Sequence, residues 1–141
     1  MSLIIAISGP AAVGKTTICD RLISEFGGKL RRLITATTRS PRPTERNGVD
    51  YIFLTNSEFR QKLNTSSFLE HEVIHGNMYG ILKQSLLDVQ FQERDILLNI
   101  DVNGTVSLRT FYQQCDDFNS KLITIFIKPQ SLSQLSQRLR E

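Results

Sequence analysis

The residues best suited to chemistry lie near the N-terminus, in the segment Gly9-Pro10-Ala11-Ala12-Val13-Gly14-Lys15-Thr16. This segment matches G-x-x-x-x-G-K-[ST], a loop whose backbone N–H groups turn inward onto phosphate oxygens. In such a loop the lysine reaches the β- and γ-phosphates, and the hydroxyl that follows is a ligand for Mg²⁺. We therefore predict a nucleoside triphosphate site, with Lys15 as a catalytic residue and Thr16 as the metal ligand. The residues predicted to contact the triphosphate are Gly9, Pro10, Ala11, Ala12, Val13, Gly14, Lys15, Thr16 and Thr17.

The elements expected around this loop are those that the motif requires. Residues 3–7 form a continuous apolar run of strand length, which is typical of a strand buried on both faces. Residues 16–26 place apolar side chains at helical spacing, and Gly27-Gly28 follows as a helix end. A chance match to the four fixed positions is expected in on the order of 1% of chains of this length. The segment is therefore predicted to bind phosphate.

Strand-like and helical segments alternate along the rest of the chain. We expect strands over residues 33–38, 51–54, 68–74, 96–102 and 122–127, and helices over residues 55–63, 82–89, 104–112 and from 131 onward. Such alternation predicts a parallel sheet with right-handed crossovers. The predicted fold is α/β, with a parallel sheet of the P-loop NTPase type, helices on both of its faces, and a small inserted mixed α/β subdomain. The expected boundaries are 1–32 for the core with the phosphate loop, 33–81 for the inserted subdomain, and 82–141 for the rest of the core.

Composition and charge limit the class of protein. The chain has 141 residues, of which 40% are hydrophobic and 22% charged, which suits one globular domain and excludes a disordered chain. No apolar run approaches the ~20 residues of a membrane span. The net charge of +3 comes from residues 29–46, which carry six basic residues and one acid. A short arginine cluster suits a small phosphate better than a nucleic acid. We expect a cytoplasmic protein with no nucleic-acid or membrane partner.

The two cysteines and two histidines are not predicted to bind a metal. Cys19 and Cys115 are far apart, and lone thiols in such a chain are usually buried fillers. His71 and His75 have no cysteine or third histidine nearby, so a zinc site is not expected.

The chain resembles guanylate kinase beyond the phosphate loop. Residues 35–53 contain the string T-T-R-x-P-R-P-x-E-x-x-G-x-D-Y-x-F, and Phe68-Leu69-Glu70 and His75-Gly76-Asn77-Met78-Tyr79-Gly80 follow in family-like order and spacing. The resemblance runs from the loop to Arg140. It implies transfer of the γ-phosphoryl group of ATP to GMP, with Mg²⁺ as the cofactor and with the inserted subdomain as the GMP-binding part.

The chemistry of the matching residues agrees with a GMP site. Arg39 and Arg42 can fork onto one phosphate, and Tyr51 and Tyr79 can each donate a hydroxyl to it. A carboxylate accepts the adjacent N1 and N2 donors of guanine, so Glu70 resembles the guanine reader. The set predicted to bind GMP is completed by the counterparts of a family serine and a family aspartate, and consists of Thr35, Arg39, Arg42, Tyr51, Glu70, Tyr79 and Asp101.

The resemblance also carries departures. Ile81 stands where the family usually has a hydroxyl near the guanine carbonyl, so we expect weaker GMP binding. Asn99 stands where the family usually has the first of two aspartates, which alters the expected Mg²⁺ environment. Arg138 matches the first lid arginine and is the second predicted catalytic residue, whereas the position of the next one lies beyond Glu141. We expect the chain to be a fragment of a longer protein rather than a shortened relative.

Two other functions fit parts of this pattern. A non-catalytic guanylate-kinase-like module that binds phosphorylated peptides would explain a missing lid, but such modules typically lose the phosphate loop that is intact here. A related P-loop kinase acting on another phosphorylated acceptor would explain Ile81, but Glu70 and the arginine string favour GMP. The expected partners are ATP and GMP, and the expected assembly is a monomer or a homodimer.

Overall fold

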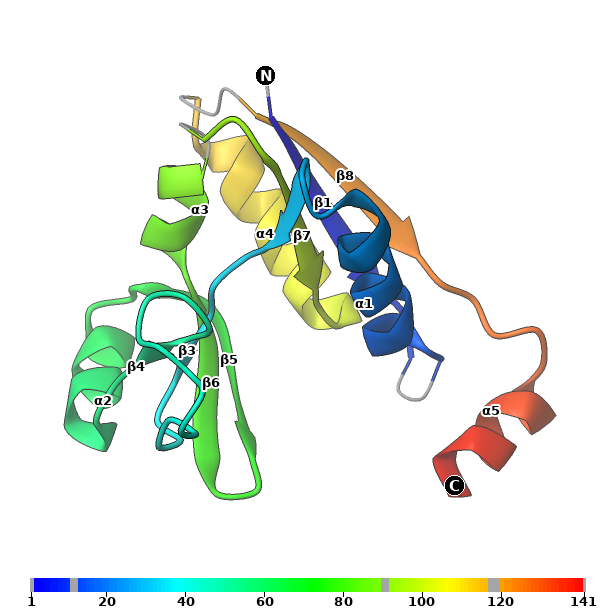
Figure 1. The fold of residues 1–141 in the computed structure, drawn as a ribbon, viewed down its shortest axis with the longest axis horizontal. Helices are drawn as coiled ribbons and strands as arrows, with labels where there is room; N and C mark the ends of the chain where they lie inside the picture. Colours follow the sequence, from blue (N-terminus) through cyan, green and yellow to red (C-terminus); the bar gives the residue numbers. More distant parts are fainter. Residues whose placement is uncertain (1, 11–12, 90–91, 117–119, 141) are drawn as a thin grey trace. The chain divides into compact units, whose positions relative to one another are not determined.

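The structure is a computed structural model that describes residues 2–10, 13–89, 92–116 and 120–140 (Figure 1). The chain divides into two compact units. The first, called the core unit, consists of Met1–Arg32 and Gln90–Glu141, and the second, called the small unit, consists of Leu33–Val89. Each unit has a sheet of its own, and each is described separately.

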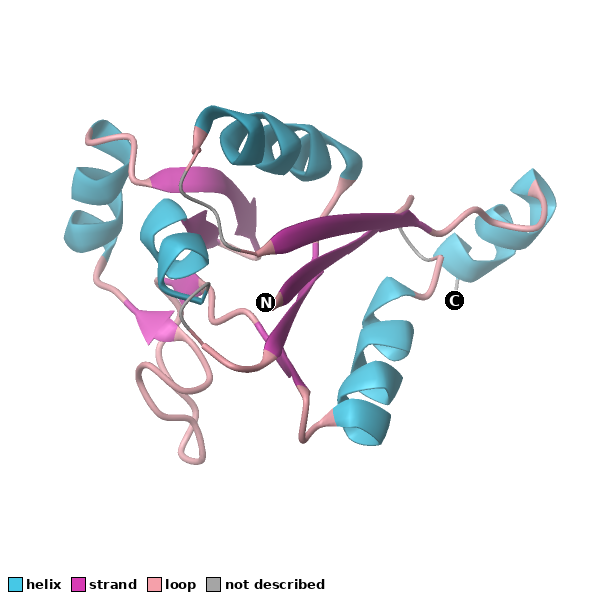
Figure 2. Ribbon diagram, turned by 90° about the horizontal axis from the view of Figure 1, so that it is seen from above, coloured by secondary structure: helices cyan, strands magenta, loops and turns pink. Residues whose placement is uncertain are grey.

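The core unit is built on a parallel four-stranded sheet. In spatial order its strands are β2 (Leu30–Arg32), β7 (Asp95–Asn99), β1 (Leu3–Ser8) and β8 (Lys121–Phe126). Helix α1 (Lys15–Phe26) connects β1 to β2, and helix α4 (Val102–Gln114) connects β7 to β8 in the opposite direction along the sheet. Because both crossovers are right-handed, the two helices cover opposite faces. Figure 2 shows helices on both sides of this sheet.

The side chains of β1 divide the core of this unit into two layers. Ile7 packs with Cys19 of α1, and this layer also contains Leu30 and Leu97. The strand residues that alternate with these point to the opposite face of the sheet and are also buried. Leu108 of α4 is buried on that face with them. This second set consists of Ile4, Ala6, Ile96 and Leu98. The expected α/β fold with a parallel sheet and helices on both faces is confirmed.

The small unit contains a mixed four-stranded sheet. Its order is β4 (Ile52–Phe53), β3 (Ala36–Thr37), β6 (Asn77–Leu82) and β5 (Phe68–Ile74), with β3 and β4 parallel and the other pairs antiparallel. Strands β5 and β6 form a hairpin whose two turn residues, His75 and Gly76, have φ angles of 50° and 79°. Positive φ at both positions gives a turn whose twist matches that of the strands it joins.

Helix α2 (Asn56–Asn64) covers one face of this sheet. The Thr55 side chain accepts a hydrogen bond from the Glu58 backbone N–H while the Glu58 side chain accepts one from the Thr55 N–H, so the two residues form a capping box at the start of the expected helix. Phe59 of α2 stacks on Phe68 with ring centroids 4.3 Å apart. We call the face of the sheet that α2 covers the packed face. It holds Ala36, Ile52, Phe68, Met78 and Leu82.

Helix α3 (Lys83–Val89) follows β6 and belongs to the small unit. The expected inserted subdomain ended at residue 81, so the second boundary differs from the prediction. Residues 82–89 stay with the small unit because α3 packs against β6, the strand that it directly continues. The chain ends in α5 (Leu132–Arg140), on which Leu132 and Leu139 are exposed. Among the described residues, no helix is both long and apolar enough to cross a membrane.

Short strands account for the remaining differences from the sequence analysis. The expected strand over residues 33–38 is reduced to Ala36–Thr37, and β2 and β6 were not predicted. Strand β2 has only three residues and lies at an edge of the sheet, so its sequence has no apolar run. Strand β6 contains Gly80, and glycine is unfavourable in a strand unless another group approaches closely. Here the group that approaches Gly80 closely is the Phe68 ring.

Replacing Gly80 with alanine should destabilise the small unit. A Cβ at residue 80 would lie 2.5 Å from Cδ1 of Phe68, a ring already held by its stacking on Phe59. Such overpacking should lower the free energy of unfolding by about 1–3 kcal/mol, measured by urea denaturation. Gly28→Ala is the matched control, because nothing lies within 4 Å of a Cβ there. Equal stability of the two variants would contradict this account of Gly80.

Candidate nucleotide and acceptor sites

The phosphate loop joins β1 to the first turn of α1 and depends on its two glycines. Gly9 has φ 155°, and a Cβ there would lie 2.6 Å from the carbonyl oxygen of Ile127. Gly14 has φ 99° and is the residue that precedes α1. Lys15 folds back over the loop, where its Nζ donates to the Gly9 carbonyl at 2.9 Å. The ammonium group therefore lies at the start of the loop whose N–H groups are expected to bind phosphate. Ala11 and Ala12 lie outside the described residues.

Thr16 lies in the first helical turn and is exposed, so its hydroxyl is accessible. Asn99, the last residue of β7, donates from Nδ2 to the Thr16 Oγ1 at 3.2 Å. The register that pairs Asn99 with Ile7 brings it to the end of β1, where the phosphate loop begins. The residue that stands in place of the family aspartate is thus a direct partner of the predicted metal ligand.

Strand register and alternation place four of the predicted GMP-binding residues on the face of the small sheet opposite the packed face. Thr37 pairs with Phe53 and with Tyr79, and Tyr79 pairs with Glu72. Residues directly opposite in a sheet share a face, and alternate residues along a strand do too. This face, which we call the site face, therefore holds Thr35, Thr37, Tyr51, Phe53, Glu70, Glu72, Tyr79 and Ile81.

Glu70 reaches the site face through a β-bulge. Phe68 pairs with Leu82, whereas Glu70 pairs with Ile81, so the register shifts by one residue between Phe68 and Glu70. Leu82 and Ile81 point to opposite faces because they are adjacent along β6. The bulge therefore separates Phe68, which is buried against α2, from Glu70, which is half-buried on the site face. Without the extra residue the two would share a face.

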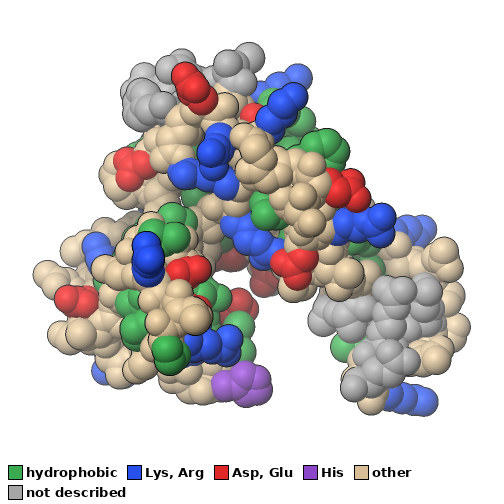
Figure 3. All heavy atoms as spheres, in the orientation of Figure 1, with side chains coloured by type: hydrophobic (Ala, Val, Ile, Leu, Met, Phe, Trp, Pro, Cys, Tyr) green, Lys and Arg blue, Asp and Glu red, His purple; other side chains and the backbone are tan. Residues whose placement is uncertain are grey.

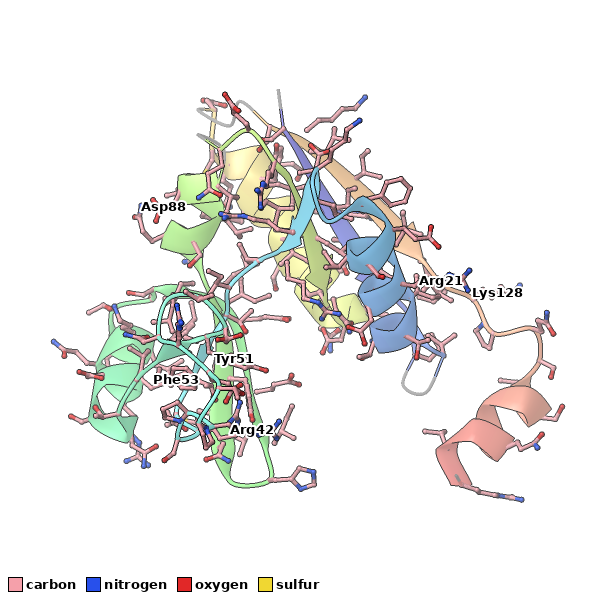
Figure 4. All side chains as sticks on the ribbon, viewed as in Figure 1. Arg21, Arg42, Tyr51, Phe53, Asp88 and Lys128 are labelled. Carbon is pink, nitrogen blue, oxygen red and sulfur yellow. The ribbon has the colours of Figure 1, made fainter. Side chains whose placement is uncertain are left out.

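The ring of Tyr51 lies against the guanidinium of Arg39 and contacts two further aromatic rings on this face. The Arg39 Cζ lies 5.3 Å from the centroid of the Tyr51 ring, a cation–π contact. The Tyr51 ring meets Phe53 at 5.7 Å and the edge of Tyr79 at 6.3 Å. The hydroxyls of Tyr79 and Tyr51 make lesser contributions that help to raise the pKa of Arg39, after that of Glu45. Three of the predicted phosphate contacts thus converge, and Figure 4 shows Arg42, Tyr51 and Phe53 on the same unit.

Glu45 is the acidic partner of Arg39, although it is not among the residues predicted to bind GMP. Arg39 donates from Nη1 to Oε1 and from Nη2 to Oε2, both at 2.9 Å. The backbone N–H of Arg42 donates to the same Oε1 at 2.8 Å. Both side chains are shielded, with 19% of Arg39 and 15% of Glu45 exposed. The glutamate of the T-T-R-x-P-R-P-x-E string was the available signal, since a carboxylate among arginines is expected to pair with one of them.

The ion pair shifts the pKa of both groups toward the charged form. The hydrogen bond from Arg39, followed by that from the Arg42 backbone, lowers the pKa of Glu45 from 4.5 to about 2. The hydrogen bond to Glu45 is the main cause that raises the pKa of Arg39 above its usual value. The guanidinium is therefore held as a permanent cation.

The remaining predicted residues have different surroundings. Asp101 precedes α4, and its Oδ1 accepts from the Gly104 N–H at 2.6 Å, so it also caps this helix. Ile81 is 5% exposed and presents an apolar side chain beside Glu70. Arg42 has an exposed side chain. The backbone of Arg138 lies in α5, and its side chain lies outside the description.

The basic cluster seen in the sequence is divided between the two units. Lys29, Arg31 and Arg32 belong to the core unit, where Arg32 pairs with Asp20 of α1. Arg39, Arg42 and Arg46 belong to the small unit. Basic and acidic side chains are interspersed on the surface seen in Figure 3.

Neither the cysteines nor the acids form a metal cluster in the part of the chain that the structure describes. Cys19 is buried in the core under α1, where burial raises the pKa of its thiol, and Cys115 is half-buried. Cys19 is thus a core residue, as expected.

The pKa of Glu45 predicts a defined loss of stability in acid. Because folding lowers this pKa, the ion pair contributes its full stability above about pH 4.5 and loses it as the pH falls toward 2. The difference in thermal midpoint between the wild type and Glu45→Gln should therefore be constant above pH 4.5 and shrink toward zero near pH 2. Scanning calorimetry at several pH values measures it. A difference that stays constant down to pH 2 would contradict the ion pair.

Comparison with known proteins places the chain in one family. A family model described as guanylate kinase matches residues 1–141. Guanylate kinases of Chlorobaculum tepidum and Porphyromonas gingivalis are 36% and 33% identical to it, over 97% and 100% of this chain and 67% and 72% of their own lengths. The guanylate kinase of Mesomycoplasma hyopneumoniae is 38% identical over the whole chain and 71% of its own length.

A solved structure agrees with the sequence relatives. The crystal structure of guanylate kinase from Anaplasma phagocytophilum matches with a TM-score of 0.63 at 27% identity, and the match covers 99% of this chain and 66% of that one. The chain thus spans about two thirds of the length of these proteins. Because the family model matches residues 1–141 and these relatives are more than 30% identical, the chain belongs to the guanylate kinase family.

Proposed function

We propose that the chain carries out the reaction of its family and transfers the γ-phosphoryl group of ATP to GMP. The observation that carries this proposal is the site face of the small sheet. There a carboxylate, two tyrosine hydroxyls and a guanidinium lie on one surface while the opposite surface is apolar. A nucleoside monophosphate needs this combination, because its base offers hydrogen-bond groups and its phosphate is an anion.

The base is assigned to Glu70 and the phosphate to the arginines. Glu70 can accept both N1–H and N2–H of guanine, a pair that adenine lacks. Arg39, Tyr51 and Tyr79 supply donors for the phosphate, and the exposed Arg42 can add a second guanidinium. Thr35 and Asp101 complete the proposed GMP set.

Catalysis is proposed to be electrostatic. In phosphoryl transfer the enzyme positions the reactants and stabilises charge on the transferring group, so no covalent nucleophile is needed. Lys15, whose ammonium group donates to the Gly9 carbonyl, is the proposed cation for the β- and γ-phosphates. Arg138 of α5 is the second proposed catalytic residue.

Magnesium is the proposed cofactor, with Thr16 as its protein ligand. Mg²⁺ usually retains several waters and binds substrate phosphates with only one or two protein groups. An exposed threonine hydroxyl at the start of α1, with an amide beside it, fits that requirement. When bound, the ion would neutralise charge on the β- and γ-phosphates.

Lys15 and Thr16 also favour catalysis over the phosphopeptide-binding module considered as an alternative, because a module without transfer has no use for them. ATP and GMP are the proposed partners. A cytoplasmic location and a monomeric or homodimeric state stay predictions.

Two variants should separate donor chemistry from acceptor recognition. Lys15→Ala should lower phosphoryl transfer at least about 10²-fold and leave GMP binding unchanged, because the lost cation acts on the transferring group. Glu70→Ala should weaken GMP binding roughly 10- to 100-fold and leave ATP binding unchanged, because two hydrogen bonds to a charged group are lost. Calorimetric titration and a coupled ADP-release assay measure these effects.

The control for this pair is Glu72→Ala, which removes an exposed carboxylate from the same face of β5. It should leave GMP affinity close to that of the wild type. A folded wild-type chain that binds no GMP would overturn the proposed acceptor. Loss of GMP binding in Lys15→Ala would overturn the division of roles.

Asn99→Asp should strengthen metal binding. The amide N–H of Asn99 now occupies a lone pair of Thr16 Oγ1, whereas a carboxylate would accept the hydroxyl proton, release that lone pair and add a negative charge. We expect about tenfold tighter Mn²⁺ binding in the presence of ATP, measured by electron paramagnetic resonance. Asn103→Asp, an exposed change on α4, is the control. Equal Mn²⁺ affinity in Asn99→Asp and Asn103→Asp would remove Asn99 from the metal environment.

A further inference from the structure

We propose that Glu45 is a positioning residue for the acceptor phosphate, because it holds one edge of the Arg39 guanidinium so that the other edge can bind the anion. This inference deepens the proposed function, on which it rests. It concerns a residue outside the predicted set of GMP contacts. It stands on hydrogen bonds and ring contacts within the small unit.

The donors of Arg39 are divided between two edges. A guanidinium carries five N–H groups in a fixed plane. Nη1 donates to the Ser40 carbonyl at 3.0 Å and to Glu45 Oε1 at 2.9 Å, and Nη2 donates to Glu45 Oε2 at 2.9 Å. The two bonds to Glu45 use the end of the group, which is formed by the two terminal nitrogens, and the bond to Ser40 uses the other N–H of Nη1. The N–H of Nε and the second N–H of Nη2 point along the side edge, where their parallel geometry matches two oxygens of a phosphate.

Glu45 is itself fixed by the loop that carries it. Its backbone N–H donates to the Arg42 carbonyl at 2.9 Å, which closes a turn with Pro43 at the second position. Its Oε1 also accepts from the Arg42 N–H. Main chain and side chain are thus both held, and the carboxylate is more shielded than a surface acid usually is. The carboxylate can therefore act as a rigid reference for Arg39.

The Tyr51 ring supplies the second constraint. Contact between the ring and the guanidinium restricts tilting of the plane, and the two bonds to Glu45 restrict rotation within the plane. Tyr51 also meets Tyr79, whose hydroxyl interacts with Arg39. Together these contacts leave one orientation of Arg39, so little conformational freedom is lost when the phosphate binds.

The opposite role for Glu45 would be competition. A carboxylate that occupied the phosphate-binding edge would have to leave before the acceptor bound, and its removal would then tighten GMP binding. The bonds of Glu45 use the end edge and leave the side edge to the phosphate, which favours positioning. The two roles predict opposite signs in one experiment.

That experiment compares Glu45→Gln with the wild type by titration with GMP and with guanosine, which lacks the phosphate. The amide keeps the shape of the side chain but loses the charge and one acceptor, so GMP should bind about tenfold more weakly and guanosine as before. Glu25→Gln is the matched control, since Glu25 pairs with Arg21 on the exposed side of α1. Tighter or unchanged GMP binding, or equal weakening of GMP and guanosine, would overturn the proposal.

A second measurement does not depend on GMP. In ¹⁵N spectra the Nε–H signal of Arg39 should be narrow in the wild type and broadened in Glu45→Gln, because the guanidinium is released. An unchanged signal would overturn the positioning role. If the wild type bound neither GMP nor guanosine, the proposed function would be wrong. The Nε–H signal would still test whether Glu45 holds Arg39.

If Glu45→Gln does not fold, Glu45→Asp replaces it, because the shorter side chain keeps the charge but cannot reach both nitrogens. It should weaken GMP binding and not guanosine binding. Equal affinities of this variant and the wild type for GMP would again overturn the proposal.

Discussion

The arrangement of the small unit depends on one extra residue in β5. The bulge between Phe68 and Glu70 allows the aromatic ring to enter the core beside α2 while the carboxylate two positions later joins the polar face. Gly80 is part of the same constraint, because only a residue without a side chain leaves space for that ring. Since the side-chain period of a strand is two, a one-residue shift decides whether Glu70 meets solvent and ligand or the apolar interior. The candidate base reader is thus placed by packing on the opposite face.

The core unit contains the phosphate loop, in which backbone N–H donors are expected to turn toward an anion. Gly9 and Gly14 adopt φ angles that other residues rarely reach, and the chain between them connects a buried strand to a helix N-terminus. Parallel pairing of β1 with β7 then brings Asn99 to the Thr16 hydroxyl. The proposed metal environment consequently combines a hydroxyl and an amide, with less negative charge than an aspartate would provide.

On the site face, the charge of Arg39 is balanced by an ion pair with Glu45. Arg39 is a shielded cation on an aromatic ring, and its partner Glu45 comes from a turn that Pro43 helps to form. A shielded guanidinium without a paired anion would lower the stability of the fold, because a buried charge loses its hydration. The Glu45 carboxylate compensates for this loss without a ligand. The proline-rich spacing of the arginine string therefore has a structural reason, because it returns the chain so that residue 45 meets residue 39.

Short sequence patterns were sufficient to predict some of these features and insufficient to predict others. The phosphate loop, the capping box at Thr55 and the buried strands around Ile4 and Leu97 follow from short patterns, because each depends on neighbouring residues and on burial. The matching order of the arginine string likewise pointed to the family. Strands β2 and β6, the bulge before Glu70 and the inclusion of α3 in the small unit depend on partners distant in sequence, which no local pattern encodes. The contact of Arg39 with Glu45, and that of Thr16 with Asn99, arose in the same way, because hydrogen bonds between side chains require a tertiary arrangement that sets their distance.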